Sequence, residues 1–427
     1  MGKIYAIILD GAADRPIKEL GNKTPLEVAK KPIIDNLAQK GCQSLITIID
    51  DKHAPESDSG TLALMSYDPL KYYPGRGTLE GMGSGLTLGY KYHASFRINF
   101  ASYDSKNGCL DRRTARDLSN DELQKLAEEI RGGVLDKNKC VEFRIIAFGR
   151  HRGILSLVSN KVKLSGNVSN TDPGFQKEGC FSVPISNYEK RPLLCKPLDD
   201  SEAAKKTAYY INKFVELSHE ILERSEVNRK RRASRKKVAN CILVRDGGES
   251  TKEWPLFKDK YKWSLMMFGQ LPSEKAIAQL IGAEFTYTKA LELQLDERYL
   301  IKIADDLAMD SHDVVYIHLK GPDEPAHDQK PLEKVKAIEK IDYYFMRELV
   351  KYLSEDDIVI VTCDHATPCE LGIHSSDKVP LLICSSIIKP DNREKYSEKD
   401  AALGNCVINK AEQIFPYLRH IENEKGT

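Results

Sequence analysis

The sequence predicts an α/β fold in which helices flank a mostly parallel sheet. Over the last third of the chain, short apolar runs typical of buried strands alternate with segments of helical length, an order characteristic of parallel sheets. In addition, Asp10, Asp323 and Asp364 each follow such an apolar run. Open α/β sheets place ligands beyond the carboxyl ends of their strands, so these three acids are expected to meet in one crevice.

The first 90 residues begin this alternation. The apolar run 4–9 predicts a strand, and a capping box at 24–27 with proline at the first helical position predicts a helix as far as residue 41. A second helix is expected after Ser57, where apolar residues recur at helical spacing. The glycine-rich segment 74–89 is expected to be an ordered loop or a junction between domains.

The middle of the chain has a mixed pattern. Apolar stretches with interspersed basic residues predict strands at 96–100, 141–148 and 153–158. A second capping box and a longer helical pattern predict helices at about 119–133 and 201–224. We therefore expect this region to form a smaller α+β domain inserted into the main one.

The last third completes the main domain. Strands are expected at 314–319, 358–362 and 379–384, and helices near 272–282, 297–308 and 331–353. The expected organisation is thus a discontinuous main domain, residues 1–90 and 238–427, with residues 91–237 inserted.

Composition excludes several classes of protein. The 427 residues carry a net charge of +1, so overall charge indicates neither a nucleic-acid partner nor a membrane surface. The ten cysteines form no Cys-x-x-Cys pair, which argues against a zinc ribbon or a thioredoxin-like motif. Without a signal peptide or an apolar run of about 20 residues, we expect a cytoplasmic protein with reduced thiols.

Side chains suited to metal binding cluster near the C-terminus. Five of the ten histidines fall between residues 312 and 374. Asp323 and His327 are four residues apart and can reach one ion if a helical turn begins there, while Asp364 and His365 are adjacent beyond a strand. Carboxylate oxygen and imidazole nitrogen together suit divalent transition ions, and this number of ligands suits two ions.

Ser57 is the candidate nucleophile. A serine at the start of a helix lies against free backbone N–H groups, a position that favours anions. Its hydroxyl needs a base or a metal to become nucleophilic, and two divalent ions would both activate it and hold the oxygens of a phosphoryl group. Ser59 competes for this role, and a plain helix-capping serine is the alternative.

Several blocks of the sequence resemble the archaeal-type, cofactor-independent phosphoglycerate mutases of the alkaline phosphatase superfamily. The blocks run from the N-terminal strand to about residue 384. They are Leu9-Asp10-Gly11, Glu56-Ser57-Asp58, Met65 to Gly77, Ser95 to Ala101, Asp111-Arg112-Arg113, His151-Arg152, Asn170 to Pro173, Asp323 to His327, Asp364 to Pro368 and His374 to Pro380. The resemblance implies an alkaline-phosphatase-like α/β fold.

The resemblance also implies roles for individual residues. One divalent ion would be held by Asp323, His327 and His374, and the other by Asp10, Ser57, Asp364 and His365. Manganese is the implied ion, with magnesium, zinc or cobalt possible. Lys275 resembles a lysine that steadies the phosphoryl group beside the nucleophile.

The implied reaction is the interconversion of 3-phosphoglycerate and 2-phosphoglycerate through a phosphoserine at Ser57, independent of 2,3-bisphosphoglycerate. This is an isomerase reaction of glycolysis and gluconeogenesis. Arginines bind carboxylate and phosphate groups in a bidentate manner, so the inserted domain should supply them. The candidate substrate-binding residues are Arg97, Arg112, Arg113, His151, Arg152 and Arg245.

Two positions depart from the family pattern. Glu56 stands where the family usually has glycine, and Thr61 where it often has histidine. A carboxylate beside a phosphate-binding serine would repel the substrate unless it points away or pairs with a cation.

Two other functions remain open on the sequence alone. One is a metal-dependent phosphatase or phosphodiesterase of the same superfamily. The other is nucleic-acid binding through residues 224–237, where eight of fourteen residues are Lys or Arg. Charge runs of this kind are more often solvated faces, and no aromatic residues that could stack on bases interleave with the cations. The expected partner is therefore a small-molecule substrate, with neither nucleic acid nor membrane.

Overall fold

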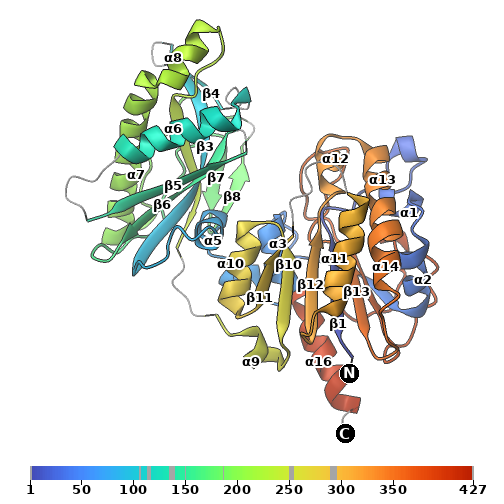
Figure 1. Cartoon of the computed structure of the whole chain (residues 1–427). Coiled ribbons are helices and arrows are strands. Elements are labelled where there is room, and N and C mark those ends of the chain that lie inside the picture. The colour runs from blue at the N-terminus through green and yellow to red at the C-terminus, as the bar shows by residue number, and fades with distance from the viewer. Residues whose placement is uncertain are drawn as a thin grey trace. The chain divides into compact units, whose positions relative to one another are not determined.

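The chain forms two compact units. The computed structural model describes residues 2–104, 107–112, 117–133, 140–149, 151–185, 187–249, 254–288 and 296–425. Unit 1 comprises Met1–Tyr73 and Glu253–Thr427, and unit 2 comprises Pro74–Lys252. The predicted α/β class is confirmed, because helices pack around extended sheets in both units (Figure 1).

Unit 1 is built on a seven-stranded sheet of order β11-β10-β12-β1-β13-β14-β2. Its centre is β1 (Ile4–Leu9), which pairs in parallel with β12 (Val314–Leu319) and β13 (Ile358–Thr362). All three strands are buried along their whole length, which explains why they are almost entirely apolar. Five of the strands are parallel, and the two at one edge, β14 and β2, are antiparallel to their neighbours. The outer strands are β10 (Leu265–Gly269), β11 (Glu284–Tyr287), β14 (Val379–Cys384) and β2 (Cys42–Ile46).

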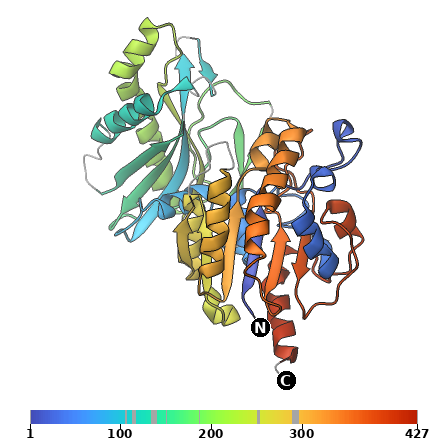
Figure 2. The same ribbon diagram turned by 45° about the vertical axis from the view of Figure 1, so that its right-hand side comes forward.

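Helices cover this sheet, and α11, α13 and α14 lie against one of its faces (Figures 1 and 2). The helix expected from residue 24 to 41 is two helices, because Ala29 leaves the helical conformation after Val28 and a second helix begins at Pro32. The helix expected at 331–353 is α13, a π-helical turn (Ile341–Met346) and α14 in succession. The helices of unit 1 are α1 (Pro25–Val28), α2 (Pro32–Lys40), α3 (Ser57–Leu64), α4 (Pro69–Tyr72), α9 (Phe257–Tyr261), α10 (Pro272–Ile281), α11 (Glu297–Met309), α12 (Asp323–His327), α13 (Pro331–Lys340), α14 (Arg347–Leu349), α15 (Glu398–Ala402) and α16 (Ile414–Lys425).

Unit 2 is an α+β unit whose main sheet packs against α6 and α7 on one face and against α5 on the other. The strand order is β4-β3-β6-β5, and β9 pairs with the long strand β3. Apolar side chains of β3, β5, β6 and β9 pack with those of α6 and α7 in one core. The elements of unit 2 are α5 (Arg76–Gly83), β3 (Tyr92–Asp104), β4 (Cys109–Asp111), α6 (Asn120–Gly133), β5 (Glu142–Phe148), β6 (Arg152–Ser159), β7 (Phe175–Glu178), β8 (Phe181–Pro184), α7 (Glu202–Arg224), α8 (Glu226–Ala233) and β9 (Cys241–Gly248).

The unit boundaries differ from the expected domain boundaries at both ends. The glycine-rich segment 74–89, expected to be an ordered loop or a junction between domains, begins at the first residue of unit 2 and contains helix α5. Its glycines let it lie directly on the sheet: a Cβ at Gly77 would come within 2.6 Å of the Phe96 Cα. At the other end, β9 was expected in the main domain, but it pairs antiparallel with β3 and so extends unit 2 to Lys252.

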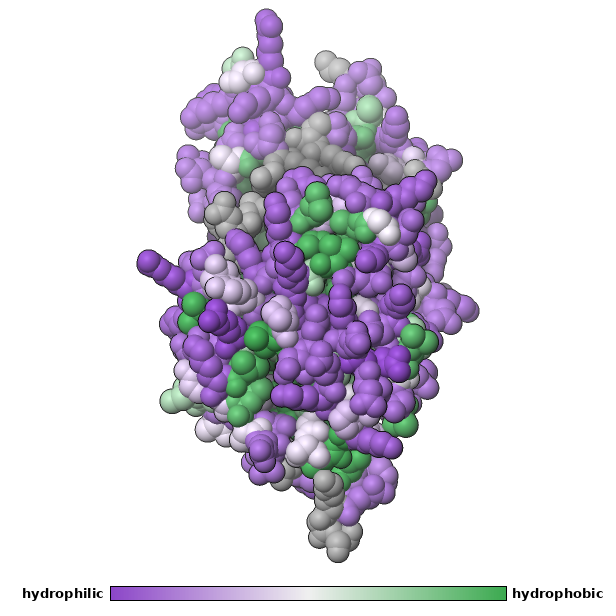
Figure 3. Space-filling view, turned by 90° about the vertical axis from the view of Figure 1, so that its right-hand side faces the viewer, coloured by the Kyte–Doolittle hydropathy of each residue, from purple (hydrophilic) through white to green (hydrophobic). Residues whose placement is uncertain are grey.

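The surface is mostly polar. The face seen in Figure 3 is largely hydrophilic, with small and separate apolar patches. In the part of the chain that the structure describes, no helix combines the length and apolar character needed to cross a membrane.

Asp342 gives unit 1 a pH-dependent contribution to stability. This buried carboxylate, in the π-helical turn, accepts hydrogen bonds from the backbone N–H groups of Ile34 (2.8 Å) and Ile33 (3.2 Å) at the start of α2. Burial raises the pKa of Asp342 to about 6, with Asp35 raising it further and Lys31 opposing the rise. Because the folded pKa exceeds the unfolded value, the folded state binds the extra proton between about pH 4 and 6, and its stability falls as pH rises through that window.

We therefore expect Asp342→Asn to remove this dependence. The unfolding free energy of the variant minus that of the wild type should become more positive by up to about 3 kcal/mol between pH 4 and pH 7. Urea unfolding of both proteins across this pH range measures the difference in unfolding free energy. The contributions of other titrating groups are the same in both proteins and cancel in this difference. A difference that stays constant with pH would contradict the prediction.

Candidate metal centre

The acids predicted from strand ends meet at one edge of the unit 1 sheet. Asp10 follows β1 directly, Asp364 lies two residues beyond β13, and Asp323 begins α12 shortly after β12. Because these three strands are adjacent and parallel, their carboxyl ends lie side by side. The backbone N–H of Gly11 donates to Asp364 Oδ1 (3.0 Å), which ties two of these loops together.

The first candidate ligand group contains Asp10, Asp364 and His365, whose ligand atoms all lie within 4.8 Å of one another. His365 Nε2 is 3.2 Å from Asp364 Oδ2 and 3.6 Å from Asp10 Oδ1. All three side chains are buried. Ser57 joins this group through its hydroxyl, which donates a hydrogen bond to Asp10 Oδ1 at 3.5 Å.

The second group contains Asp323 and His374, again with His365. His374 Nε2 lies 3.6 Å from Asp323 Oδ1, and His327 Nε2 lies 3.2 Å from Asp323 Oδ2. The two imidazoles also approach each other, with 3.2 Å between the Nε2 atoms of His327 and His374. All seven residues predicted as metal ligands therefore come together, and His365 stands in both groups.

The other ring nitrogen of each histidine is held by a hydrogen bond. Nδ1 pairs with the Gly372 carbonyl in His327 (2.8 Å) and with the Pro55 carbonyl in His374 (2.9 Å). In His365 it pairs with Thr367 Oγ1 at 2.9 Å. Such contacts fix the tautomer and leave Nε2 as the coordinating atom, as is usual for metal-binding histidines.

The residues fit a pair of divalent cations. Asp364 Oδ2 and His365 Nε2 are buried atoms that make no hydrogen bond within the described residues. Burial raises the pKa of the Asp364 carboxyl, but His365 and His318 outweigh this and hold it well below its usual range, so it is an anion. Buried anions and imidazoles without other partners are the donor set that divalent transition ions take.

Glu56 faces a cation rather than standing alone. Its carboxylate lies 4.0 Å from His374 Nδ1. Burial lowers the pKa of His374, but Glu56 and Asp323 outweigh it and raise that pKa to about 9. The other departure from the family pattern, Thr61, is buried and hydrogen-bonded to the Tyr316 hydroxyl at 3.0 Å. Neither residue therefore disrupts the two ligand groups.

Ser57 is the first residue of α3 and lies between a carboxylate and an ammonium group. Lys320 Nζ donates to Ser57 Oγ at 3.2 Å and is 3.0 Å from Asp10 Oδ1. Helix α3 can come this close because of Gly60, where a Cβ would lie 2.5 Å from the Asp364 carbonyl oxygen. The candidate nucleophile, a candidate ligand carboxylate and a cation are thus in direct contact.

Sequence reasoning missed Lys320. The pairing of Leu9 with Leu319 puts Lys320 beside Asp10, one residue beyond each strand. The signal was available, because a lysine directly after an apolar run occupies the same position as Asp10. Lys275, the predicted phosphoryl-steadying residue, lies instead with its Nζ 5.5 Å from the ring centroid of Tyr287. Within the described residues, no hydrogen bond or ion pair joins Lys275 to Ser57.

His318 and Glu274 were also missed as site residues. His318 lies on β12 and is buried next to the first ligand group, and Glu274 on α10 is hydrogen-bonded to its Nδ1. Burial and Lys320 lower the pKa of His318, but Asp364, Glu274 and Asp10 outweigh them and raise it well above its usual range. His318 thus carries a proton when no cation other than Lys320 is beside these carboxylates.

Three of the predicted arginines gather in unit 2. Arg97 and Arg245 are directly paired on β3 and β9. Arg112 forms a bidentate ion pair with the buried carboxylate of Asp172, and Arg245 Nε lies 4.0 Å from the same carboxylate. Both guanidinium groups lie over the ring of Phe175, at 5.2 Å for Arg112 and 4.2 Å for Arg245. Stacked and ion-paired arginines of this kind are fixed in orientation before any anion arrives.

Arg152 and the preceding His151 lie at the start of β6, which pairs with the strand that carries Arg97. Arg152 starts β6 opposite Asn99, and the His151 carbonyl accepts a hydrogen bond from the Phe100 N–H at 2.8 Å. These contacts place both residues on the far side of β3 from β9. Arg113 lies outside the described residues.

The basic run 224–237 is partly neutralised within unit 2. The buried Arg231 binds Glu122 (3.1 Å) and Asp117, and Arg232 pairs with Glu223. Lys230 pairs with Glu226 at 3.0 Å. These contacts support the interpretation of the run as a largely structural, solvated face.

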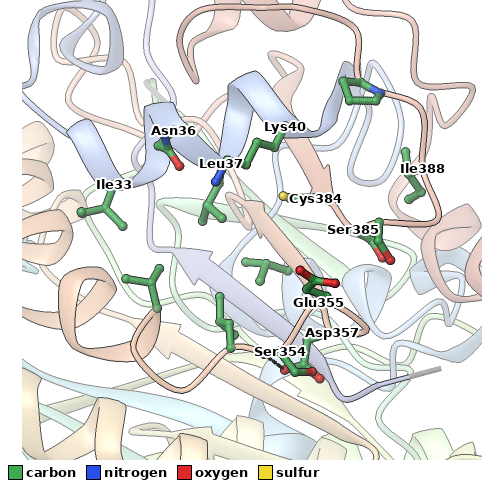
Figure 4. A pocket seen from close by; sticks show the side chains of 15 residues that line it. Ile33, Asn36, Leu37, Lys40, Ser354, Glu355, Asp357, Cys384, Ser385 and Ile388 are labelled. Atoms are coloured by element: carbon green, nitrogen blue, oxygen red, sulfur yellow. Dashed lines mark hydrogen bonds between the residues drawn. The ribbon is translucent and has the colours of Figure 1, made fainter.

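A cavity of about 590 Å³ in unit 1 lies away from the ligand groups (Figure 4). It is lined by Leu37 and Lys40 of α2, by Val359 near the amino end of β13 and by Cys384 at the end of the antiparallel strand β14. These positions are at the opposite end of the sheet from Asp364. The cavity is therefore separate from the candidate metal centre.

The fold and the ligand groups define a class of protein: an α/β protein with a candidate two-metal centre and an adjacent serine at the carboxyl edge of a mainly parallel sheet. The family model described as 2,3-bisphosphoglycerate-independent phosphoglycerate mutase matches residues 38–228. A curated protein of that name from Aeropyrum pernix is 36% identical over 93% of this chain and 93% of its own length. One from Pyrococcus furiosus is 34% identical over 98% of this chain and 96% of its own.

Solved structures agree with this assignment. A protein from Pyrococcus horikoshii matches with a TM-score of 0.78 and 26% identity, covering 99% of this chain and 97% of its own. The cofactor-independent phosphoglycerate mutase from Thermoplasma acidophilum matches with a TM-score of 0.67 and 26% identity, covering 99% and 100%. The chain belongs to the 2,3-bisphosphoglycerate-independent phosphoglycerate mutase family.

Proposed function

We propose that this protein interconverts 3-phosphoglycerate and 2-phosphoglycerate without 2,3-bisphosphoglycerate. Family membership supports this reaction, and the position of Ser57 supports its chemical mechanism. Ser57 begins a helix, contacts Asp10 and Lys320, and lies at the edge of two candidate ligand groups. This arrangement suits a serine that accepts and returns a phosphoryl group.

Each half of the proposed reaction is a phosphoryl transfer. Ser57 Oγ loses its proton and attacks phosphorus, the bond from phosphorus to the O3 atom of the substrate breaks, and glycerate takes up a proton at that oxygen. In the second half, the O2 hydroxyl of glycerate loses its proton and attacks the phosphoserine, the bond from phosphorus to Ser57 Oγ breaks, and Ser57 takes up a proton. Lys320 is placed to hold a phosphoryl oxygen beside Ser57, and the first N–H groups of α3 favour the same anion.

The proposed ligands are those expected from the sequence. Asp323, His327 and His374 would hold one divalent ion, and Asp10, Ser57, Asp364 and His365 the other. Bound there, such ions supply Lewis-acid stabilisation of the phosphoryl oxygens and lower the pKa of the serine hydroxyl. We propose manganese as the ion, with magnesium, zinc and cobalt as alternatives, and a cytoplasmic location in keeping with a reaction of central carbon metabolism.

The arginine group of unit 2 is proposed to bind an anionic group of the substrate. Arg97, Arg112 and Arg245 are held by Asp172, Glu80 and Asp246, which fixes their orientation without consuming all five donors of each guanidinium. Burial lowers the pKa of Arg97 to about 10, so this side chain remains charged at neutral pH.

We therefore expect Arg245→Met to weaken substrate binding. Loss of a charge-assisted contact should raise KM for 3-phosphoglycerate about 10- to 100-fold, with a smaller change in kcat. The matched control is Arg144→Met, which removes another arginine of unit 2 that pairs with Glu142 at 2.8 Å. Steady-state kinetics measure the effect, and an unchanged KM for the Arg245 variant would contradict the prediction.

A single assay tests the function. The purified protein is given 3-phosphoglycerate and manganese without 2,3-bisphosphoglycerate, and 2-phosphoglycerate is detected through enolase. We expect isomerisation that disappears with a chelator and returns with added metal. Release of inorganic phosphate without isomerisation would show a phosphatase instead, and activity that persists after complete metal removal would contradict the two-metal mechanism.

A further inference from the structure

His318 lies where a metal ligand would be expected. It is on β12, and the parallel pairing with β1 puts it opposite Ile8, two residues before Asp10. The side chain is fully buried. Polar residues are rare on the central strands of this sheet, so the placement of an ionisable one beside Asp10 and Asp364 needs a physical reason.

The distances around His318 match those around His365. His318 Nε2 is 3.1 Å from Asp364 Oδ2 and 3.3 Å from Asp10 Oδ1. His365 Nε2 is 3.2 Å and 3.6 Å from the same two oxygens. Ligand atoms that each lie about 2.0–2.2 Å from one ion are separated from one another by roughly 3–3.5 Å. Both imidazoles therefore flank the same pair of oxygens at the spacing of a shared ion.

The approach of His318 to Asp364 is not that of a good hydrogen bond. Asp364 Oδ2 is buried and, among the described residues, has no hydrogen-bond partner of acceptable geometry, although His318 Nε2 is only 3.1 Å away. The nitrogen and the oxygen are thus close without meeting the geometry of a hydrogen bond. Two ligand atoms directed at a common third point have this relation. The ammonium group of Lys320 also lies near this histidine, with its Nζ 3.5 Å from His318 Nε2.

The opposite side of the ring is anchored by a buried carboxylate. His318 Nδ1 is hydrogen-bonded to Glu274 Oε1, and Glu274 Oε2 accepts hydrogen bonds from the backbone N–H groups of Gln270 (2.7 Å) and Leu271 (2.8 Å). Glu274 is therefore immobilised at the start of α10. A carboxylate that holds Nδ1 and directs Nε2 toward an ion is the usual companion of a metal-binding histidine.

We propose that His318 is a further ligand of the ion held by Asp10, Asp364 and His365, and that Glu274 orients it. The proposal rests on the proposed function only in requiring a divalent ion in this group. The enlarged site would bind the same divalent transition ions, because His318 adds one more imidazole nitrogen to a set of carboxylates and imidazole.

Metal titration of the apo protein tests the proposal without an activity assay. Isothermal calorimetry with manganese should show two sites in the wild type. His318→Gln should weaken one site at least about 100-fold and Glu274→Gln the same site about 10- to 100-fold, with the other site retained. The matched control is His312→Gln, which removes a histidine that is tied to Asp310 at 2.9 Å and lies before β12. Two sites of wild-type affinity in the His318 variant would overturn the proposal.

A direct measurement on the wild type avoids any effect of the variants on folding. In a crystal loaded with zinc, located by anomalous scattering, His318 Nε2 should lie about 2.0–2.1 Å from the ion. An ion bound to Asp10 and Asp364 with His318 uncoordinated would overturn the proposal. Binding of no ion would overturn both this proposal and the metal part of the proposed function, whereas coordination by His318 without mutase activity would support this proposal and overturn only the function.

Discussion

Replacement of Ser57 by alanine is expected to abolish mutase turnover. Ser57 Oγ is the atom that would form and break the bond to phosphorus, and no other hydroxyl of α3 is in described contact with Asp10. Loss of a covalent nucleophile lowers kcat by about 10,000-fold or more in enzymes where it has been removed. The substitution removes a single oxygen atom. Asp10 and Lys320, the two partners of that oxygen, still pair with each other, so the fold should persist.

The neighbouring serine provides the control. Ser59 Oγ donates to the Glu56 carbonyl (3.1 Å) and accepts from the Glu56 N–H (3.0 Å), which are contacts that cap α3. Ser59→Ala should cost about 1 kcal/mol of stability and leave most of the activity. Initial rates and mass spectrometry of the phosphorylated enzyme distinguish the two serines. An active Ser57 variant with an inactive Ser59 variant would transfer the role to Ser59.

Lys320→Met is expected to have the second largest effect. The ammonium contacts the Ser57 hydroxyl at 3.2 Å and Asp10 at 3.0 Å, so its charge is next to the position that the transferring phosphoryl group would occupy. Burial lowers the pKa of Lys320, but Asp10, Glu274 and Asp364 raise it overall, and the group is cationic at neutral pH. Removal of one fixed donor to a transition-state oxyanion costs about 100- to 1,000-fold in kcat.

The matched control is Lys275→Met, the lysine that the sequence suggested. Its ammonium lies over Tyr287, so we expect a change in rate of less than about tenfold, comparable to loss of one cation–π contact. Measurement of kcat and KM for both variants separates a role in chemistry from a role in binding. A severe loss for Lys275 with a mild one for Lys320 would restore the assignment made from the sequence.

The ligands of the candidate metal centre could be predicted because they follow strands. Asp10, Asp323 and Asp364 are each adjacent in sequence to an apolar run, and a parallel sheet brings such positions together whatever its detailed register. His327 and His365 followed from their spacing to Asp323 and Asp364. The role of His374 and the division of the ligands into two groups came from the resemblance to a known family.

His318 and Glu274 could not be selected in this way. Their place beside Asp10 depends on the register in which Leu9 pairs with Leu319, and on helix α10 reaching β12, neither of which a sequence pattern reports. The boundaries of unit 2 could not be predicted from the sequence for a similar reason. Strand β9 looks like any buried strand, and its partner β3 lies more than a hundred residues earlier in the chain, so local composition does not assign it.

The presence of His365 in both ligand groups couples the two groups thermodynamically. Its Nε2 carries one lone pair, which can be given to one ion only. An ion that takes this nitrogen changes the donor set left for the other, so the affinity of each site depends on the occupancy of its neighbour, and the dependence is reciprocal. We therefore expect the binding isotherm for two ions to differ from the sum of two independent isotherms.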